Sequence, residues 1–369
     1  MANFKYLQLA DRLKSDILKR IYPPGERIPT ESELSELFSA SRYTVRQAVA
    51  QLETEGLLHR IQGSGTYVTE NLPISRPASP SQSNHIGLVF MDDKNYIFSD
   101  IIRGASDYLV SQNYLLNVFV TDGNYDSEKR VLDLLLKSQP LGVLLEPTNS
   151  GLLSVNYELY QQLAEQIPCL LLHSPDIGAC PALSLNDREG ARQLTDYLLE
   201  LGHTKIGTLF CFEESTAQIR YCGFVDALRS RGLTQDSDAA VWTMRSRVSD
   251  LLEPTGSLTL DRMLQSVTAV ICHDDRVAYA LIRYLEQKGI RVPQDISVVG
   301  YDDSFYATLG LPITSVTHPK VQYGVHLAQA LLEMIHTPGT VDLSRYTVTP
   351  ELVIRSSAAP PACKKEDGF

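Results

Sequence analysis

Basic and hydroxyl side chains follow one another at the start of an expected helix, where they could bind a nucleic acid. Ser41 can accept a hydrogen bond from the first turn of a helix, which places Arg42, Thr44 and Arg46 in its first turns. A guanidinium group binds a phosphate or the edge of a guanine through two parallel hydrogen bonds. We therefore expect Arg42 and Arg46 to contact guanine or phosphate, and Thr44 to contact the DNA backbone.

Three helices and a hairpin are expected to hold these side chains. Thr30 and Glu33 form a Thr-x-x-Glu capping box that opens the helix before Ser41. Apolar residues at helical spacing mark three buried faces: Leu9, Leu13 and Ile17; Leu34, Leu37 and Phe38; Val45, Val49 and Leu52. After Gly56, residues 57–61 and 66–68 flank a Gln-Gly-Ser-Gly tip, which predicts a hairpin. This order predicts an α+β winged helix-turn-helix, although any small α+β module can contain amphipathic helices and a hairpin.

The combined order of these motifs is more specific than any one of them. The pattern Pro-Thr-Glu-x-x-Leu-x-x-x-Phe-x-x-Ser-Arg-x-Thr-Val-Arg-x-Ala, followed by Gln-Gly-x-Gly-Thr-x-Val, resembles the N-terminal domain of the GntR family of bacterial transcription regulators over residues 4–70. The resemblance implies binding to double-stranded operator DNA. Further contacts are expected from Lys5 to a phosphate, from Thr30 and Glu31 to the backbone or a cytosine, and from the wing tip Gln62, Gly63 and Gly65 in the minor groove.

The charge of the chain is unevenly distributed. The formal net charge is −11, yet residues 1–70 hold nine basic and nine acidic side chains, so the acidic surplus lies beyond residue 70. A local basic face made of Lys5, Arg42, Arg46 and Arg60 can therefore approach DNA while the acidic remainder stays away from it.

Composition divides the chain and limits its class. Residues 70–84 contain three prolines and four serines, which predicts a linker. We expect a DNA-binding domain over 1–70, a linker over 71–84 and an effector-binding and dimerisation domain over 85–369. No apolar run approaches the ~20 residues of a membrane helix, and the N-terminus lacks a signal-peptide pattern. The six cysteines lack Cys-x-x-Cys spacing, which favours the cytoplasm and argues against a metal site.

Beyond residue 84, short apolar runs alternate with amphipathic stretches. The expected strands are His85–Met91, Leu115–Thr121, Gly142–Glu146, Pro168–His173, Ala182–Leu185, Lys205–Phe210, Ala269–His273, Ile296–Tyr301 and Ser315–His318. The expected helices are Asp100–Ser111, Ser127–Ser138, Glu189–Leu201, Ala217–Arg231, Asp275–Lys288 and Val321–Ile335. Such alternation predicts parallel sheets covered by helices, and this length favours two α/β lobes with a cleft between them.

Several strings in this region occur in a recognisable order. The first is the segment 197–206, which contains Leu-Gly-His, and the second is Arg220 followed by Cys-Gly-Phe. The others are the segment 272–278 with Cys-His-Asp-Asp, the segment 292–303 with Gly-Tyr-Asp-Asp, and the segment 311–316. Together they resemble the sugar-binding core of LacI-type regulators, which share the periplasmic-binding-protein fold. The strings around 96–104, 146–148 and 315–320, with the GntR-type start, resemble L-arabinose-responsive repressors of Gram-positive bacteria.

A sugar site needs carboxylates, arginine and an aromatic ring, and such sites form at the carboxyl ends of parallel strands. The resemblance matches Arg220 and Asp302 most directly. The other expected ligand-binding residues are Tyr96 and Phe98 as ring-stacking walls, with Glu146, His173, His273 and Asp274 at strand ends. His173 and His273 could equally be strand-end groups satisfied within the protein, and Tyr301 is expected in the core. Many relatives have Asn where this chain has Asp274, so the exact sugar stays open.

These observations favour a repressor that acts as a homodimer and is released from DNA by a small-molecule sugar, with L-arabinose the expected effector. A regulator of another sugar, or a sugar-binding protein with no role on DNA, remains the alternative. We expect no cofactor and no enzymatic activity. The adjacent carboxylates at 274–275 and 302–303 should point to opposite sides and cannot flank one bond, and there is no Gly-x-Ser-x-Gly elbow and no P-loop.

Overall fold

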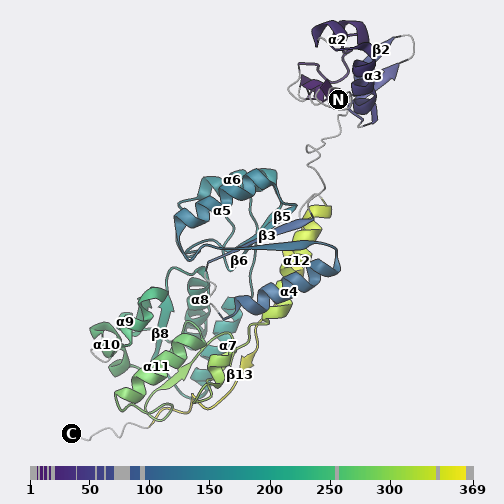
Figure 1. Cartoon of the computed structure of the whole chain (residues 1–369). Coiled ribbons are helices and arrows are strands. Elements are labelled where there is room, and N and C mark those ends of the chain that lie inside the picture. The colour runs from purple at the N-terminus through teal and green to yellow at the C-terminus, as the bar shows by residue number, and fades with distance from the viewer. Residues whose placement is uncertain are drawn as a thin grey trace, which may run out of the picture. The chain divides into compact units, whose positions relative to one another are not determined.

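The computed structural model describes residues 6, 9–10, 12–14, 16–17, 21–38, 40–54, 56–61, 64–69, 84–91, 96–253, 257–337 and 341–362. These residues form two compact units, one within 1–82 and one within 83–369 (Figure 1). Nearly all of the expected linker lies outside the described residues, so the domain boundaries stay predictions. None of the described helices is long and apolar enough to cross a membrane.

The N-terminal unit contains the expected helices and hairpin. Its elements are α2 (Glu31–Leu37), α3 (Arg42–Thr54), β1 (Leu58–Ile61) and β2 (Gly65–Val68), and residues 9–10, 12–14 and 16–17 are also helical. The capping box is present, because the Thr30 amide donates to Glu33 at 2.7 Å and the Glu33 amide donates to the Thr30 hydroxyl at 3.3 Å. The prediction that Leu37 is buried is wrong, because its side chain is 63 % exposed. Leu34 is the buried residue of α2.

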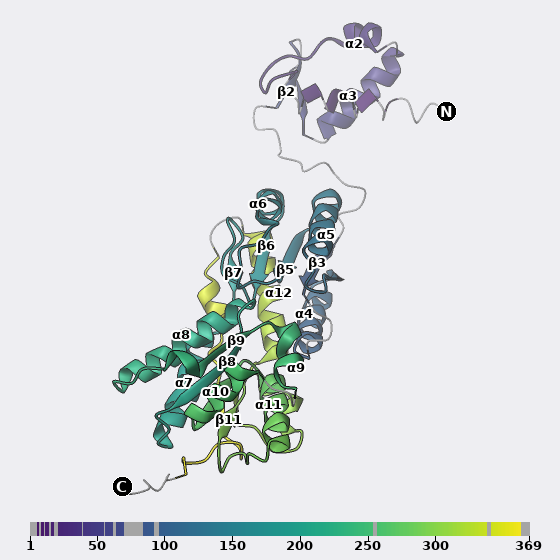
Figure 2. The ribbon, with the colours of Figure 1, turned by 90° about the vertical axis from the view of Figure 1, so that its left-hand side faces the viewer.

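The second unit consists of two lobes, each with its own parallel sheet (Figures 1 and 2). The first sheet has the order β4-β3-β5-β6-β7. Its strands are β3 (His85–Phe90), β4 (Leu115–Val120), β5 (Gly142–Leu145), β6 (Cys169–Leu172) and β7 (Ala182–Leu183). The helices around it are α4 (Phe98–Ser111), α5 (Tyr125–Ser138), α6 (Tyr157–Gln166) and α12 (Lys320–His336).

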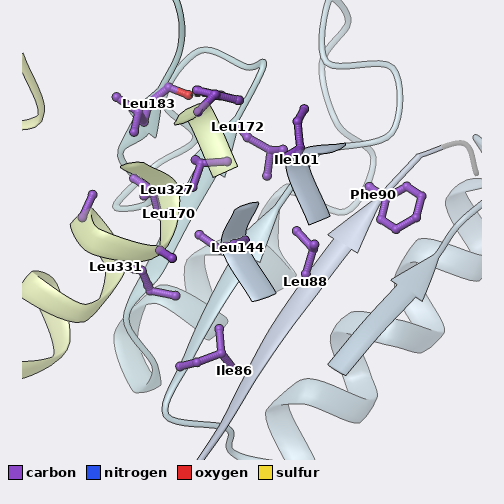
Figure 3. Close-up of a cluster of buried hydrophobic side chains, with 14 of the residues drawn as sticks. Ile86, Leu88, Phe90, Ile101, Leu144, Leu170, Leu172, Leu183, Leu327 and Leu331 are labelled. Carbon is purple, nitrogen blue, oxygen red and sulfur yellow. Dashed lines mark hydrogen bonds between the residues drawn. The ribbon is translucent and has the colours of Figure 1, made fainter. Parts of the chain in front are cut away.

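Alternating residues of the first sheet pack on opposite faces. Ile86 and Leu88 of β3 lie in one cluster with α4 and α12, whereas Val89 lies in a second cluster with α5 and α6. Figure 3 shows the first cluster, in which Leu327 and Leu331 of α12 pack over the strands. Both faces of the central strands β3, β5 and β6 are therefore covered, which explains why these strands are almost continuously apolar, whereas the edge strand β4 is largely exposed.

The second sheet has the order β11-β10-β8-β9. Its strands are β8 (Ile206–Cys211), β9 (Ala240–Thr243), β10 (Ala269–Cys272) and β11 (Ser297–Val299). Helices α7 (Asp187–Glu200) and α8 (Ser215–Ser230) cover one face, and α10 (Leu258–Ser266) and α11 (Asp275–Gln287) cover the other. A short pair, β12 (Ser315–Val316) with β13 (Leu352–Val353), and the helix α9 (Val248–Leu251) complete this lobe.

The pattern-based prediction found every strand of the first sheet and missed elements with few buried residues. The missed elements are α6, β9, α9, α10 and β13. In α6 only Tyr160 and Leu163 are buried among polar residues, so its apolar period is weak.

The two lobes touch closely beside the cleft. The Gly151 amide donates to the Glu213 carbonyl at 2.8 Å, and the Gln218 side chain donates to the Gly151 carbonyl at 2.8 Å. A Cβ atom at position 151 would lie 2.5 Å from the Phe212 carbonyl oxygen, so glycine is required for this approach.

One buried carboxyl group connects α11 to the strand ends of the second lobe. Asp275 accepts hydrogen bonds from the Ser304 amide at 2.7 Å and from the Ser315 hydroxyl at 2.6 Å. Burial, with the nearby charge of Asp302, raises the pKa of Asp275 to about 7. Because the folded pKa lies above the ordinary value, this group stabilises the fold below about pH 4, and that contribution is lost as the pH rises through 7.

The unfolding free energy of the wild-type protein should fall between pH 5 and pH 8 as Asp275 ionises. We therefore expect a smaller fall in the Asp275→Asn variant, whose amide does not ionise. The measurement is chemical denaturation of both proteins followed by fluorescence of Trp242, the single tryptophan of the chain, which lies in this lobe. The difference in unfolding free energy, variant minus wild type, should become more positive toward pH 8. A difference that does not change with pH would contradict the raised pKa.

Candidate functional site

The start of α3 presents the expected DNA-binding side chains. The Thr44 amide donates to the Ser41 hydroxyl at 3.2 Å, so Ser41 caps the helix as predicted. Val45, Val49 and Leu52 are buried, which turns the opposite side of α3 outward. Arg42 is exposed, and the side chain of Arg46 is 67 % exposed.

Glu31 holds two arginines of this unit. One of its carboxylate oxygens accepts from Arg46 at 3.1 Å and the other accepts from Arg60 at 3.1 Å. The hydrogen bond from Arg46 is the main reason why the pKa of Glu31 lies below its ordinary value. The predicted contact of Glu31 with DNA stays a prediction, and in the structure its carboxylate orients the guanidinium groups of Arg46 and Arg60.

The hairpin has the geometry of a wing. Strand β1 pairs antiparallel with β2, from Leu58 opposite Val68 to Ile61 opposite Gly65. Gly65 has a φ of 140°, a backbone conformation that side chains rarely adopt, so glycine is favoured at this position. Lys5, Gln62 and Gly63, which were predicted to bind DNA, lie outside the described residues.

A cavity between the two lobes brings together six of the eight predicted ligand-binding residues. They are Glu146, His173, Arg220, His273, Asp274 and Asp302. Glu146 and His173 follow strands of the first lobe, and the other four belong to the second lobe. His318, between β12 and α12, also lines the cavity.

Arg220 is the centre of one buried network. Its Nε donates to Asp187 at 2.8 Å and its Nη1 donates to the His273 carbonyl at 2.6 Å, while its Nη2 lies 3.5 Å from Asp302. The guanidinium also stacks on the ring of Tyr301, which is buried as expected. Burial opposes the positive charge, but the two carboxylates outweigh it and raise the pKa of Arg220.

Arg245 and Glu214 form a second network that the sequence analysis missed. Arg245 pairs with Glu214 and donates to Asp274 at 2.6 Å, and His273 Nε2 lies 2.9 Å from Glu214. Although burial opposes ionisation, Arg245 and His273 keep the pKa of Glu214 well below its ordinary value. Asp274 is in addition the N-cap of α11, where it accepts from the Val277 amide at 2.7 Å.

Two histidines and a carboxylate line the opposite side of the cavity. His173 Nδ1 lies 3.4 Å from Glu146, and His173 Nε2 lies 3.2 Å from His318 Nε2. Burial lowers the pKa of His318 well below its ordinary value. The Nδ1 atoms of His273 and His318 are both buried and have no hydrogen-bond partner among the described residues.

The two predicted aromatic walls do not line this cavity. Phe98 is 2 % exposed and packs on Phe90 with 5.0 Å between the ring centroids, so the structure places its ring in the core of the first lobe. The hydroxyl of Tyr96 donates to Asp302 at 2.6 Å, and its ring meets Phe305 and Tyr306 edge-on. Tyr96 therefore connects the two lobes. Neither ring lines the cavity in this arrangement of the lobes, and their role as ring-stacking walls stays a prediction.

The cavity is small as it stands. Its volume is about 30 Å³, which is room for one or two water molecules, whereas ligand pockets typically measure ~300–1,000 Å³. A sugar ring therefore requires that side chains or lobes move apart.

Two family models match separate parts of the chain. Residues 5–68 match the model of bacterial regulatory proteins of the gntR family, and residues 195–358 match a periplasmic binding protein-like domain. A LacI family transcriptional regulator from Mycobacterium smegmatis has 25 % identity and a TM-score of 0.65 over 75 % of this chain and 99 % of its own. A putative ribose operon repressor from Burkholderia thailandensis shares the fold, with 22 % identity and a TM-score of 0.62 over 73 % of this chain and 99 % of its own.

Two curated relatives match nearly the whole chain. The arabinose metabolism transcriptional repressor of Geobacillus stearothermophilus is 32 % identical over 96 % of this chain and 97 % of its own length. The repressor of the same name from Halalkalibacterium halodurans is 32 % identical over 99 % of this chain and 98 % of its own. The chain therefore belongs to the family of arabinose metabolism transcriptional repressors, in which a GntR-type DNA-binding domain precedes a LacI-like two-lobed domain.

Proposed function

We propose that this protein represses sugar utilisation genes by binding operator DNA through its N-terminal unit, and that L-arabinose bound between the lobes releases it. The carrying observation is the convergence of Arg220, Asp302 and four other predicted residues on one interlobe cavity, in a chain that also has the GntR-type unit. The names of the two full-length relatives support L-arabinose as the effector.

The chemistry of the cavity suits a neutral sugar. Arg220 and Arg245 are each already paired with two carboxylates, so no unbalanced positive charge favours an anionic ligand. Sugar hydroxyls both donate and accept. They can serve the carboxylates and the Nδ1 atoms of His273 and His318, for which the described residues provide no partner.

The proposed release mechanism is a shift between lobe arrangements. Because the cavity is too small for a sugar ring, ligand binding must favour a different arrangement of the lobes or their side chains. A coupling of typically ~1–3 kcal/mol would weaken operator binding roughly 5–150-fold. We also propose that the protein works in the cytoplasm as a homodimer, since a dimer matches the two-fold symmetry of an operator.

A catalytic role is not part of this proposal. Neighbouring carboxylates at the strand ends diverge: Asp274 pairs with Arg245, while Asp275 accepts from Ser304 and Ser315. Asp302 faces Arg220, while Asp303 pairs with Arg355. Neither adjacent pair can flank a single bond of a substrate.

A gel shift with a palindromic fragment of an arabinose promoter tests the proposal. We expect retention of the fragment by the protein, and release by L-arabinose but not by D-xylose, D-galactose or D-glucose. Release by one of the other sugars would show that L-arabinose is not the specific effector. Failure to retain any promoter fragment would contradict the proposed binding to operator DNA.

Arg46→Ala should weaken operator binding by roughly 5–150-fold, because one bidentate contact is worth about 1–3 kcal/mol. Affinity for L-arabinose should stay unchanged. Both affinities can be measured by fluorescence anisotropy and calorimetry, with Arg283→Ala, an exposed arginine of α11, as the control. Wild-type operator affinity in the variant would exclude Arg46 from the DNA contact.

Asp302→Asn should leave operator binding intact and weaken sugar binding about 10-fold or more, because hydrogen bonds to charged groups are worth ~1.5–3 kcal/mol. The matched control is Asp303→Asn, since Asp303 pairs with Arg355 at 2.6 Å and does not line the cavity. Calorimetry with L-arabinose and the gel shift provide the two measurements. Equal responses of the two variants to the sugar would refute the role given to Asp302.

A further inference from the structure

A second and larger groove lies between the lobes, next to the candidate sugar cavity. Its volume is about 720 Å³, within the usual range of ligand pockets. Met91, Asp122 and Asn149 line it from the first lobe, and Glu213, Met244 and Arg276 line it from the second. Met91 and Arg245 line both spaces, so the groove and the cavity are neighbours that share a wall.

The groove combines an apolar floor with a few polar groups. Met91 and Met244, together with Val248, Val277 and Ala280, supply the apolar part of its lining. Ligand sites commonly have this composition, because apolar contacts bind a ring while a few polar groups fix its orientation.

Two polar side chains of the groove have hydrogen-bonding atoms for which the described residues provide no partner. Glu213 is 4 % exposed; its Oε1 accepts from the Arg245 amide, while its Oε2 has no hydrogen-bond partner among the described residues. Arg276 is half-buried. Its guanidinium makes no hydrogen bond or ion pair within the part of the chain that the structure describes, and its charge helps to lower the pKa of Asp274. A buried carboxylate oxygen without a partner is costly, so a ligand donor there would be favourable.

The charges of the groove exclude acidic ligands. Asp122 and Glu213 line the groove together with one guanidinium that forms no ion pair, that of Arg276, because Arg245 is already bound by Glu214 and Asp274. A sugar phosphate or sugar acid would meet an excess of carboxylates. A neutral polyhydroxylated group can donate to the carboxylates and accept from Arg276.

We infer that this groove is a subsite for a second sugar unit, so that the protein binds glycosides whose first unit occupies the cavity. The inference rests on the proposed function, since the first unit is taken to be L-arabinose. It follows from the shared lining at Met91 and Arg245, from the room that the groove provides, and from the unused acceptor and donor of Glu213 and Arg276. A second sugar unit in the groove would touch both lobes. It would therefore shift the same equilibrium between lobe arrangements as the monosaccharide.

Isothermal titration calorimetry of the full-length protein tests this inference with L-arabinose and with L-arabinose disaccharides that differ in linkage. We expect at least one disaccharide to bind with one molecule per chain. Glu213→Gln and Arg276→Ala should each weaken that disaccharide about 5-fold to 30-fold, because a hydrogen bond to a charged group is lost or made neutral. Both variants should change the affinity for L-arabinose less than about 2-fold. Arg283→Ala, on the same helix as Arg276, is the control and should change neither affinity.

The other outcomes overturn the inference in distinguishable ways. If L-arabinose binds and no disaccharide does, the subsite is refuted while the proposed function stands. If the variants weaken both ligands equally, Glu213 and Arg276 belong to the monosaccharide site and the groove is not a separate subsite. If L-arabinose binds at two places per chain, the groove is an independent site. If L-arabinose does not bind the wild-type protein, the proposed effector fails together with the subsite.

Discussion

Pairing of buried charge is the constraint on which the cleft depends. Arg220 is buried and the side chain of Arg245 is 13 % exposed, and each is held by two carboxylates from different elements. A single charge at either position would be strongly unfavourable, and removal of one partner would leave another unpaired. The ends of β8, β10 and β11 and the starts of α7, α8 and α11 must therefore meet with little freedom. The wall that the second lobe contributes to the cleft is rigid because its charges satisfy one another, so the movement that admits a ligand is one between the lobes.

This pairing also explains how a ligand could act on the lobes. Asp302 takes part in the Arg220 network of the second lobe and accepts the hydroxyl of Tyr96 from the first lobe. On the other side, His173 of the first lobe meets His318 in the segment between β12 and α12. A sugar that competes for Asp302 or for the histidines changes contacts made by both lobes at once. Differential contact of this kind is what a shift between two arrangements requires.

The position of a residue at the cavity could be predicted from sequence where the residue follows a buried strand, although its role in binding stays a prediction. Glu146, His173, His273 and Asp302 each come directly after an apolar run, and parallel strands bring their carboxyl ends to one edge. Arg245 follows a short edge strand whose alternation is too brief to recognise, so nothing in the local pattern marked it. Tyr96 and Phe98 both precede or begin α4 and yet differ in their surroundings, because the hydroxyl of Tyr96 bonds to Asp302 whereas the ring of Phe98 turns into the core. Which of two neighbouring side chains faces the cleft is decided by tertiary packing and not by sequence spacing.

The arginines of the two units differ in exposure, and they are suited to different kinds of binding. Arg46 and Arg60 are about half or more exposed and share Glu31, and exposed ion pairs are weak and screened by salt. A phosphate can replace Glu31 at little cost, so this pairing keeps the guanidinium groups oriented without preventing DNA contact. Arg220 is buried, bonded at three of its nitrogens and stacked on Tyr301, so a ligand cannot displace its partners in the same way. Affinity for DNA should thus depend strongly on salt concentration. Ligand binding in the cleft should depend on it only weakly, because buried ion pairs are little screened by salt.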